Sequence, residues 1–221
     1  KFAVESVAID GDASVPEKTL RDLMVTRPKG LPVIAKGHLI DADLEADVSA
    51  ILGYYQRRGW IDARVKSSVE DASEPGRLRV AISITEGPRA FVRQRRVEGV
   101  EHLTPEELDA IFTVKVGEPF NPAAVRHDVG ALTARYRNSG WPSATVQDRY
   151  TISEDRTAVD VDYGVEEGER AFFGRTIIRG NAFTRVERIR RQVAWNEGEP
   201  FSEEKVADTQ QNLARTGVFR S

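Results

Sequence analysis

The chain repeats itself at a fixed interval of 81 residues, and this period constrains its fold more than any single motif does. The run Glu86-Gly87-Pro88-Arg89-Ala90-Phe91 returns as Glu167-Gly168-Glu169-Arg170-Ala171-Phe172. Two further pairs keep the same interval: Gly59-Trp60 with Gly140-Trp141, and Gly117-Glu118-Pro119-Phe120 with Gly198-Glu199-Pro200-Phe201. Because motifs of different kinds hold one register, the sequence indicates a domain copied in tandem.

This period divides the 221 residues into two complete units and part of a third. We expect one unit at residues 1–90 and a second at residues 91–171. An incomplete third unit is expected at residues 172–221, without its last two strands. Each complete unit is near the lower size limit at which a chain can build its own core.

The composition excludes several classes of function. With 35 acidic and 32 basic side chains the net charge is -3, so no basic field attracts nucleic acid or anionic lipid. The sequence contains no run of about 18 apolar residues that could span a bilayer as a helix. A strand-like pattern begins at once at Lys1, so we expect any targeting segment to have been removed or to lie outside this sequence.

Neither metal chemistry nor catalysis is predicted. The chain has no cysteine, which excludes disulfides and thiolate metal sites. Its three histidines, His38, His102 and His127, lie in different parts of the repeat and lack the spacing of a ligand cluster. The motifs of nucleotide-binding loops and of common hydrolases are missing as well. We therefore predict no metal, no cofactor and no enzymatic activity.

Each complete unit has the order strand, helix, helix, strand, strand. The opening strands are expected at residues 2–9 and 91–97, each followed by a glycine-containing turn. The closing strands are expected at residues 62–70 and 77–85, and at residues 143–152 and 157–166. The last strand of each unit alternates apolar with polar residues, which indicates one buried face: Leu78, Val80, Ile82, Ile84, and Val159, Val161, Tyr163, Val165.

The two helices of a unit carry start and stop signals. Thr104 before Pro105 predicts the start of a short helix, and Asn121 before Pro122 predicts the start of a longer one. The glycine of Gly140-Trp141 is expected to end the longer helix as its C-cap, with the indole as an apolar plug. Two helices covering one face of a three-stranded mixed sheet would bury their apolar stripes. The predicted fold class is therefore α+β.

The third unit is expected to open with a strand at residues 172–179. Two helices should follow, the first carrying Val186, Ile189 and Val193 and the second carrying Val206 and Leu213. Because the last two strands of this unit are missing, we predict that its opening strand does not lie within a complete three-stranded sheet.

This combination of elements and motifs resembles the polypeptide-transport-associated (POTRA) domain over the whole chain. The resemblance rests on the Gly180-Asn181 turn, the Gly-Glu-Pro-Phe entry to the second helix, the Gly-Trp exit and the Glu-Gly linker between units. It implies tandem POTRA domains of an outer-membrane assembly factor of the BamA and TamA superfamily. Three units in total would favour a TamA-like arm, and five would favour a BamA-like arm.

The resemblance also implies a location and partners. In this superfamily the POTRA arm lies in the periplasm of a Gram-negative bacterium and precedes a C-terminal membrane β-barrel. The implied partners are unfolded outer-membrane or secreted client proteins and periplasmic accessory proteins, with no role for nucleic acid.

Such a unit can bind an extended segment of another protein by strand addition. In a sheet of this topology the last strand is central, and the strand before it lies at the edge with unpaired backbone N–H and C=O groups. An unfolded client can add a strand there, and a groove beside the longer helix would take its apolar side chains. The residues expected to bind are Arg64, Val65, Lys66 and Ser67, and Ala144, Thr145, Val146 and Gln147.

Other interpretations stay open. The edges could be ordinary solvent-facing strands, since Arg64, Lys66, Asp148 and Arg149 are residues that discourage edge pairing. The chain could be the arm of a two-partner secretion transporter, which typically carries two units, although the third repeat argues against this. It could also be a structural spacer that docks accessory proteins without contacting clients.

Short linkers between the units predict two hinges. Gly87 and Pro88 form the first, and Gly168 and Glu169 form the second. Neither linker leaves slack, so the arm should bend at these points. Pro88 should make the first hinge stiffer than the second, because its ring fixes φ.

Overall fold

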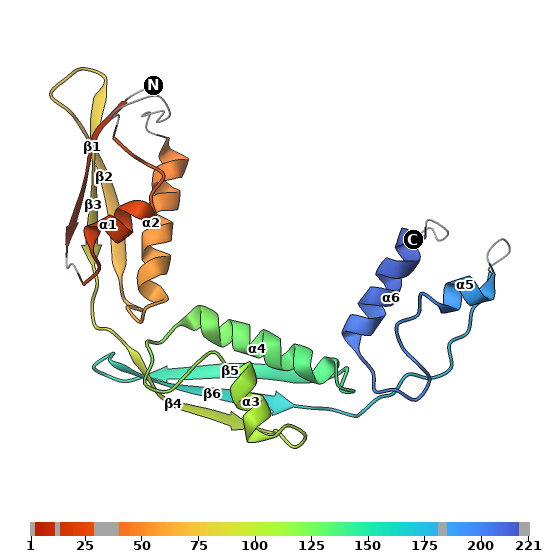
Figure 1. The fold of residues 1–221 in the computed structure, drawn as a ribbon. Helices are drawn as coiled ribbons and strands as arrows, with labels where there is room; N and C mark the ends of the chain where they lie inside the picture. The colour runs from red at the N-terminus through yellow and green to blue at the C-terminus, as the bar shows by residue number, and fades with distance from the viewer. Residues whose placement is uncertain (1–2, 12–13, 29–39, 181–184, 217–221) are drawn as a thin grey trace. The chain divides into compact units, whose positions relative to one another are not determined.

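The computed structural model describes residues 3–11, 14–28, 40–180 and 185–216 (Figure 1). By internal packing the chain divides into two compact units. One comprises residues 1–94, 116–123 and 151–160, and the other comprises residues 95–115, 124–150 and 161–221. One of these compact units contains the whole of the first three-stranded sheet, and the other contains most of the second.

The first sheet has the strand order β1-β3-β2. Its strands are β1 (Ala3–Gly11), β2 (Arg64–Asp71) and β3 (Arg77–Thr85). The central strand β3 is parallel to β1 and antiparallel to β2. The last strand of the repeat is therefore central, as predicted, and the sheet is mixed.

Two helices lie on one face of this sheet, α1 (Glu17–Asp22) and α2 (Asp41–Gln56) (Figure 1). Between them and the sheet lies a core in which Ile51, Tyr55 and Ile82 are fully buried. Strand β3 alternates as expected, with its inward residues buried and most of its outward ones exposed. Burial of one such side chain contributes about 1.5–3 kcal/mol, so the alternation fixes which face of the strand turns inward.

The second sheet repeats this arrangement with the strand order β4-β6-β5. Its strands are β4 (Phe91–Glu98), β5 (Thr145–Ile152) and β6 (Ala158–Glu166). The helices α3 (Pro105–Ile111) and α4 (Pro122–Arg137) cover one face (Figure 1). The predicted fold class is confirmed: α+β, with a three-stranded mixed sheet covered on one face by two helices in each complete repeat.

The predicted helix starts are confirmed in the second repeat. Thr104 caps α3 and forms a capping box with Glu107, and the side chain of Asn121 accepts a hydrogen bond from the N–H of Ala123. The prediction that Gly140 is the C-cap of α4 was wrong. The helix ends at Arg137, and Gly140 follows at φ 111°. Trp141 is 6% exposed, so the indole does act as an apolar plug.

The third repeat contributes α5 (Val186–Arg190) and α6 (Glu203–Arg215). Val193 lies beyond the end of α5, which stops earlier than predicted. Within the described residues the expected strand at 172–179 does not form, and Phe172 makes an isolated bridge to Pro200. The backbone N–H and C=O groups of a strand need a neighbouring strand to bond to. Among the described residues, this segment has only the bridge to Pro200.

Of the helices in the described ranges, none combines the length and the apolar character that crossing a bilayer would require.

Candidate functional site

The edge strand β2 is regular and largely exposed. It pairs with β3 in an unbroken register from Arg64 opposite Thr85 to Asp71 opposite Leu78. Val65 is half-buried against the core, whereas Arg64, Lys66 and Ser67 are exposed. Since β2 is the terminal strand of its sheet among the described residues, one side of its backbone faces away from β3.

The edge strand β5 has a similar exposure pattern. Val146 is half-buried, and Thr145 and Gln147 are exposed. Ala144 was expected to belong to this edge, but it precedes the strand and is fully buried. Its N–H bonds to the carbonyl of Trp141 and its carbonyl accepts from Arg137, so its backbone is already used within the repeat.

Each sheet has a second edge, formed by β1 in the first sheet and by β4 in the second. The pairing of β1 with β3 shifts register between Val4 and Ser6, a feature that interrupts an edge. At β4 the segment from Gly117 to Pro119 bonds to Phe91 and Val92, so the outer side of that strand is occupied at its start. These features interrupt the edges at β1 and β4, whereas the register of β2 is unbroken.

A buried carboxylate in each complete repeat ties the second helix to the loop before it. Asp47 accepts hydrogen bonds from the N–H groups of Val25 and Thr26, at 2.6 and 2.9 Å. Asp128 accepts from the N–H groups of Thr113 and Val114, at 2.8 and 2.9 Å. In the third repeat the corresponding residue is Thr209, whose hydroxyl accepts from the N–H of Ala194 at 2.9 Å.

Asp128 has two further donors, the hydroxyls of Thr113 at 2.6 Å and Tyr163 at 3.3 Å. Burial raises the pKa of Tyr163, and the charge and hydrogen bond of Asp128 raise it further. This carboxylate is therefore structural, because each of its oxygens is satisfied inside the repeat.

A second buried carboxylate follows the last strand of each complete repeat. Glu86 accepts hydrogen bonds from the backbone N–H and hydroxyl of Ser14, at 2.8 and 2.5 Å, and from the hydroxyl of Tyr55 at 3.0 Å. Glu167 accepts from Tyr136 at 2.6 Å and from the residues at the equivalent loop. Burial alone would raise the pKa of Glu167, but these hydrogen bonds outweigh it and lower the pKa to about 2.

Neither pair of buried carboxylates was predicted from the sequence, where Glu167 belongs to the Glu-Gly linker. A signal existed for Asp47 and Asp128, because an acid recurs after 81 residues inside an apolar helix stripe. An acid that repeats on a face meant for the core must be paired or hydrogen-bonded there.

The predicted hinge residues lie in linkers that pack closely on the preceding helix exit. Ala90 donates its N–H to the carbonyl of Gly59 at 2.8 Å, and Ala171 makes the same bond to Gly140 at 2.7 Å. A Cβ on Gly59 would lie 2.5 Å from the carbonyl oxygen of Ala90, so this contact requires glycine. Gly87 and Gly168 both have positive φ, at 72° and 74°.

An arginine in each linker lies between two aromatic rings. The guanidinium carbon of Arg89 is 4.5 Å from the ring centre of Trp60 and 5.2 Å from that of Phe91. Arg170 stacks in the same way, 4.9 Å from Trp141 and 5.2 Å from Phe172. These cation–π contacts contribute about 0.5–1 kcal/mol each at exposed sites, and they limit the freedom of the linkers.

Exchanging the hinge residues should exchange hinge stiffness. Pro88→Glu should widen the distribution of distances across the first linker, and Glu169→Pro should narrow it across the second, because proline removes freedom in φ. Spin labels on cysteines introduced at the exposed positions Ser49, Arg126 and Asp208 would report both distributions, since the native chain has no cysteine. The predicted ranking would be contradicted if the two linkers had equally wide distance distributions in the wild type and neither substitution changed them.

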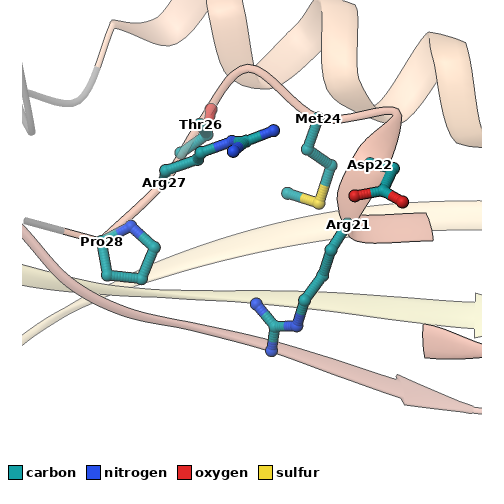
Figure 2. Close-up of a pocket in the computed structure, with 6 residues that line it drawn as sticks. All are labelled: Arg21, Asp22, Met24, Thr26, Arg27 and Pro28. Atoms are coloured by element: carbon teal, nitrogen blue, oxygen red, sulfur yellow. The ribbon is translucent and has the colours of Figure 1, made fainter. Parts of the chain in front are cut away.

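A pocket of about 330 Å³ lies beside α1 (Figure 2). Its lining comes from α1 and the segment that follows: Arg21, Asp22, Met24, Thr26, Arg27 and Pro28. Arg21 already donates to the carbonyl of Val7 at 2.8 Å and pairs with Glu17. No residue of the predicted edges lines this pocket.

Comparison with known proteins gives consistent results. A family model described as POTRA, surface antigen variable number repeat, matches residues 2–87, 90–168 and 171–221. The outer membrane protein assembly factor BamA of Nitratidesulfovibrio vulgaris is 25% identical over 225 residues, which cover 99% of this chain and 28% of that protein. A putative outer membrane protein assembly factor of Treponema pallidum is 27% identical over 223 residues, covering 99% of this chain and 26% of that protein.

The chain thus spans roughly a quarter of the length of these relatives. Among solved structures, BamA POTRA3-5 of Haemophilus influenzae aligns with a TM-score of 0.61 at 22% identity, covering 100% of this chain and 87% of that one. This likeness supports the fold found above. Since three successive matches to one family model account for nearly the whole sequence, the chain belongs to the POTRA family.

Proposed function

We propose that this chain is the periplasmic arm of an outer-membrane β-barrel assembly factor. In this role it binds unfolded client proteins by strand addition at β2 and β5 and delivers them to a membrane β-barrel of the same protein. The relatives named as assembly factors support the general role. We also propose that the repeats divide at residues 90 and 171, as the period predicts.

The observation that carries client binding is the pair of terminal strands with largely exposed side chains. Backbone groups on the outer side of such a strand can bond to any extended chain, which suits a factor that receives many different clients. Half-buried Val65 and Val146 lie at the same place in both repeats and would give a client side chain an apolar contact.

Proline substitution tests this proposal. At successive edge positions proline removes alternately an N–H that bonds to the central strand and an N–H that points outward. We would scan residues 64–68 and 145–148 and keep the variants that melt at the wild-type temperature. The retained variants are those in which proline removes an outward-pointing N–H. They should no longer bind a client β-signal peptide, as measured by fluorescence anisotropy.

The matched control replaces the same residue by alanine, which keeps the N–H group. Alanine variants should bind the peptide with an affinity within about threefold of the wild type, a change below about 0.7 kcal/mol. Unchanged peptide binding in every well-folded proline variant would reject strand addition at these edges.

The alternative function is a structural spacer that docks folded accessory proteins. It is favoured by the exposed charges of Arg64 and Lys66, which discourage pairing with another strand. Capture of folded periplasmic proteins but not of unfolded barrel precursors by the immobilised chain would favour the spacer. The arm of a two-partner secretion transporter is disfavoured by the match of a third repeat.

A further inference from the structure

One carboxylate oxygen of Glu167 is saturated, whereas the other faces a histidine. Oε1 accepts from the N–H groups of Glu101 and His102, at 2.8 and 3.1 Å, and from the hydroxyl of Tyr136 at 2.6 Å. Oε2 contacts Nδ1 of His102. Because three donors hold Oε1, the carboxylate has a fixed orientation with Oε2 directed at the imidazole.

Two further ligand groups stand beside this oxygen. Glu101 is exposed and the His102 side chain is 47% exposed, whereas the Glu167 side chain is only 8% exposed. One potential ligand atom from each of the three residues lies within 4.8 Å of the other two. The His102 ring also lies against Trp141, with ring centres 4.7 Å apart, which restrains its orientation.

The first repeat shows that the fold does not need a histidine at this position. There Ser14 takes the place of His102, and its hydroxyl and N–H bond to the two oxygens of Glu86. A serine is therefore sufficient to close the loop onto the carboxylate. The imidazole of the second repeat adds a nitrogen ligand and a neighbouring acid to the same scaffold.

We propose that Glu101, His102 and Glu167 form a surface site for a divalent transition-metal ion, with Zn²⁺ as the best match. One imidazole nitrogen and two carboxylate oxygens are a ligand set that zinc accepts, with water in the remaining position. The nitrogen ligand favours zinc over magnesium and calcium, which prefer oxygen ligands. The site joins the loop between β4 and α3 to the end of β6, so a bound ion would cross-link these segments.

His102→Ser is the sharpest test, because it installs the residue that the first repeat uses in the same contact. Isothermal titration with zinc chloride should show one equivalent bound by the wild-type chain and at least tenfold weaker binding by His102→Ser. Glu101→Gln should also weaken binding and involves an exposed side chain. His127→Ser is the matched control, because His127 is exposed and the one carboxylate it is seen to contact, Asp128 at 3.4 Å, already accepts from other donors.

A second readout locates the ion. Addition of zinc should shift the ring nitrogen resonances of His102 in ¹⁵N NMR spectra and leave those of His127 in place. Zinc should also raise the melting temperature of the wild-type chain but not that of His102→Ser. The proposal is overturned if His102→Ser binds zinc as tightly as the wild type does, or if the wild-type chain binds none at millimolar zinc.

Discussion

Gly99→Ala should destabilise the second repeat by about 2–5 kcal/mol, or prevent it from folding. Gly99 has a φ of 79°, and an alanine Cβ there would lie 2.0 Å from the carbonyl oxygen of Val165 on the central strand. The left-handed backbone costs a residue with a side chain about 1–2 kcal/mol. Relieving the overlap requires the end of β4 to move away from β6, which adds about 1–3 kcal/mol.

Gly117→Ala provides the matched control for this effect. Gly117 has a similar φ of 86°, but no atom lies within 4 Å of the position that its Cβ would take. Gly117→Ala should therefore lose only the free energy that the left-handed backbone costs a residue with a side chain, about 1–2 kcal/mol. Urea unfolding followed by circular dichroism would give both free energies of unfolding, and equal losses in the two variants would contradict the importance of the close approach at Gly99.

Asp128→Ala should lower the free energy of unfolding of the same repeat by about 3–5 kcal/mol. The substitution leaves four donors without their acceptor, among them the buried N–H of Val114, and opens a cavity under α4. Such a loss is a large part of the stability of a domain of this size, which is about 5–15 kcal/mol. Thermal and urea unfolding of the isolated chain would measure it.

Two comparisons separate the lost hydrogen bonds from a general loss of charge. Asp128→Asn keeps one carbonyl acceptor and nearly the same volume, so it should be intermediate. Asp148→Ala removes an exposed acid on β5 and should change stability by no more than about 0.5 kcal/mol. If Asp128→Ala were as mild as Asp148→Ala, the buried carboxylate would have no structural role.

The arrangement of each sheet was predictable because it depends on patterns local to the strands. Strands β3 and β6 alternate strictly, and such alternation identifies a strand with one buried face. The pairs Thr104-Pro105 and Asn121-Pro122 mark helix starts through their own backbone chemistry. The 81-residue period then gave a second copy of the closing strands, in which the same alternation recurs.

The buried carboxylates were not predicted, because their partners are distant in the sequence. Glu167 bonds to residues 65 and 66 positions away, and only the folded sheet brings them together. The predicted edge began one residue too early, at Ala144, for a related reason. The turn after Trp141 takes up its N–H group before β5 begins, and edge exposure therefore starts at Thr145.

The central position of β3 and β6 has a consequence for biogenesis. In each complete repeat the strand that joins the other two is synthesised last, and the carboxylate that ties it to the first loop follows it directly. A repeat that emerges from its N-terminus therefore has two unconnected strands until its final segment arrives. Folding should therefore proceed repeat by repeat, and each complete repeat exposes unpaired strands until its last strand is present.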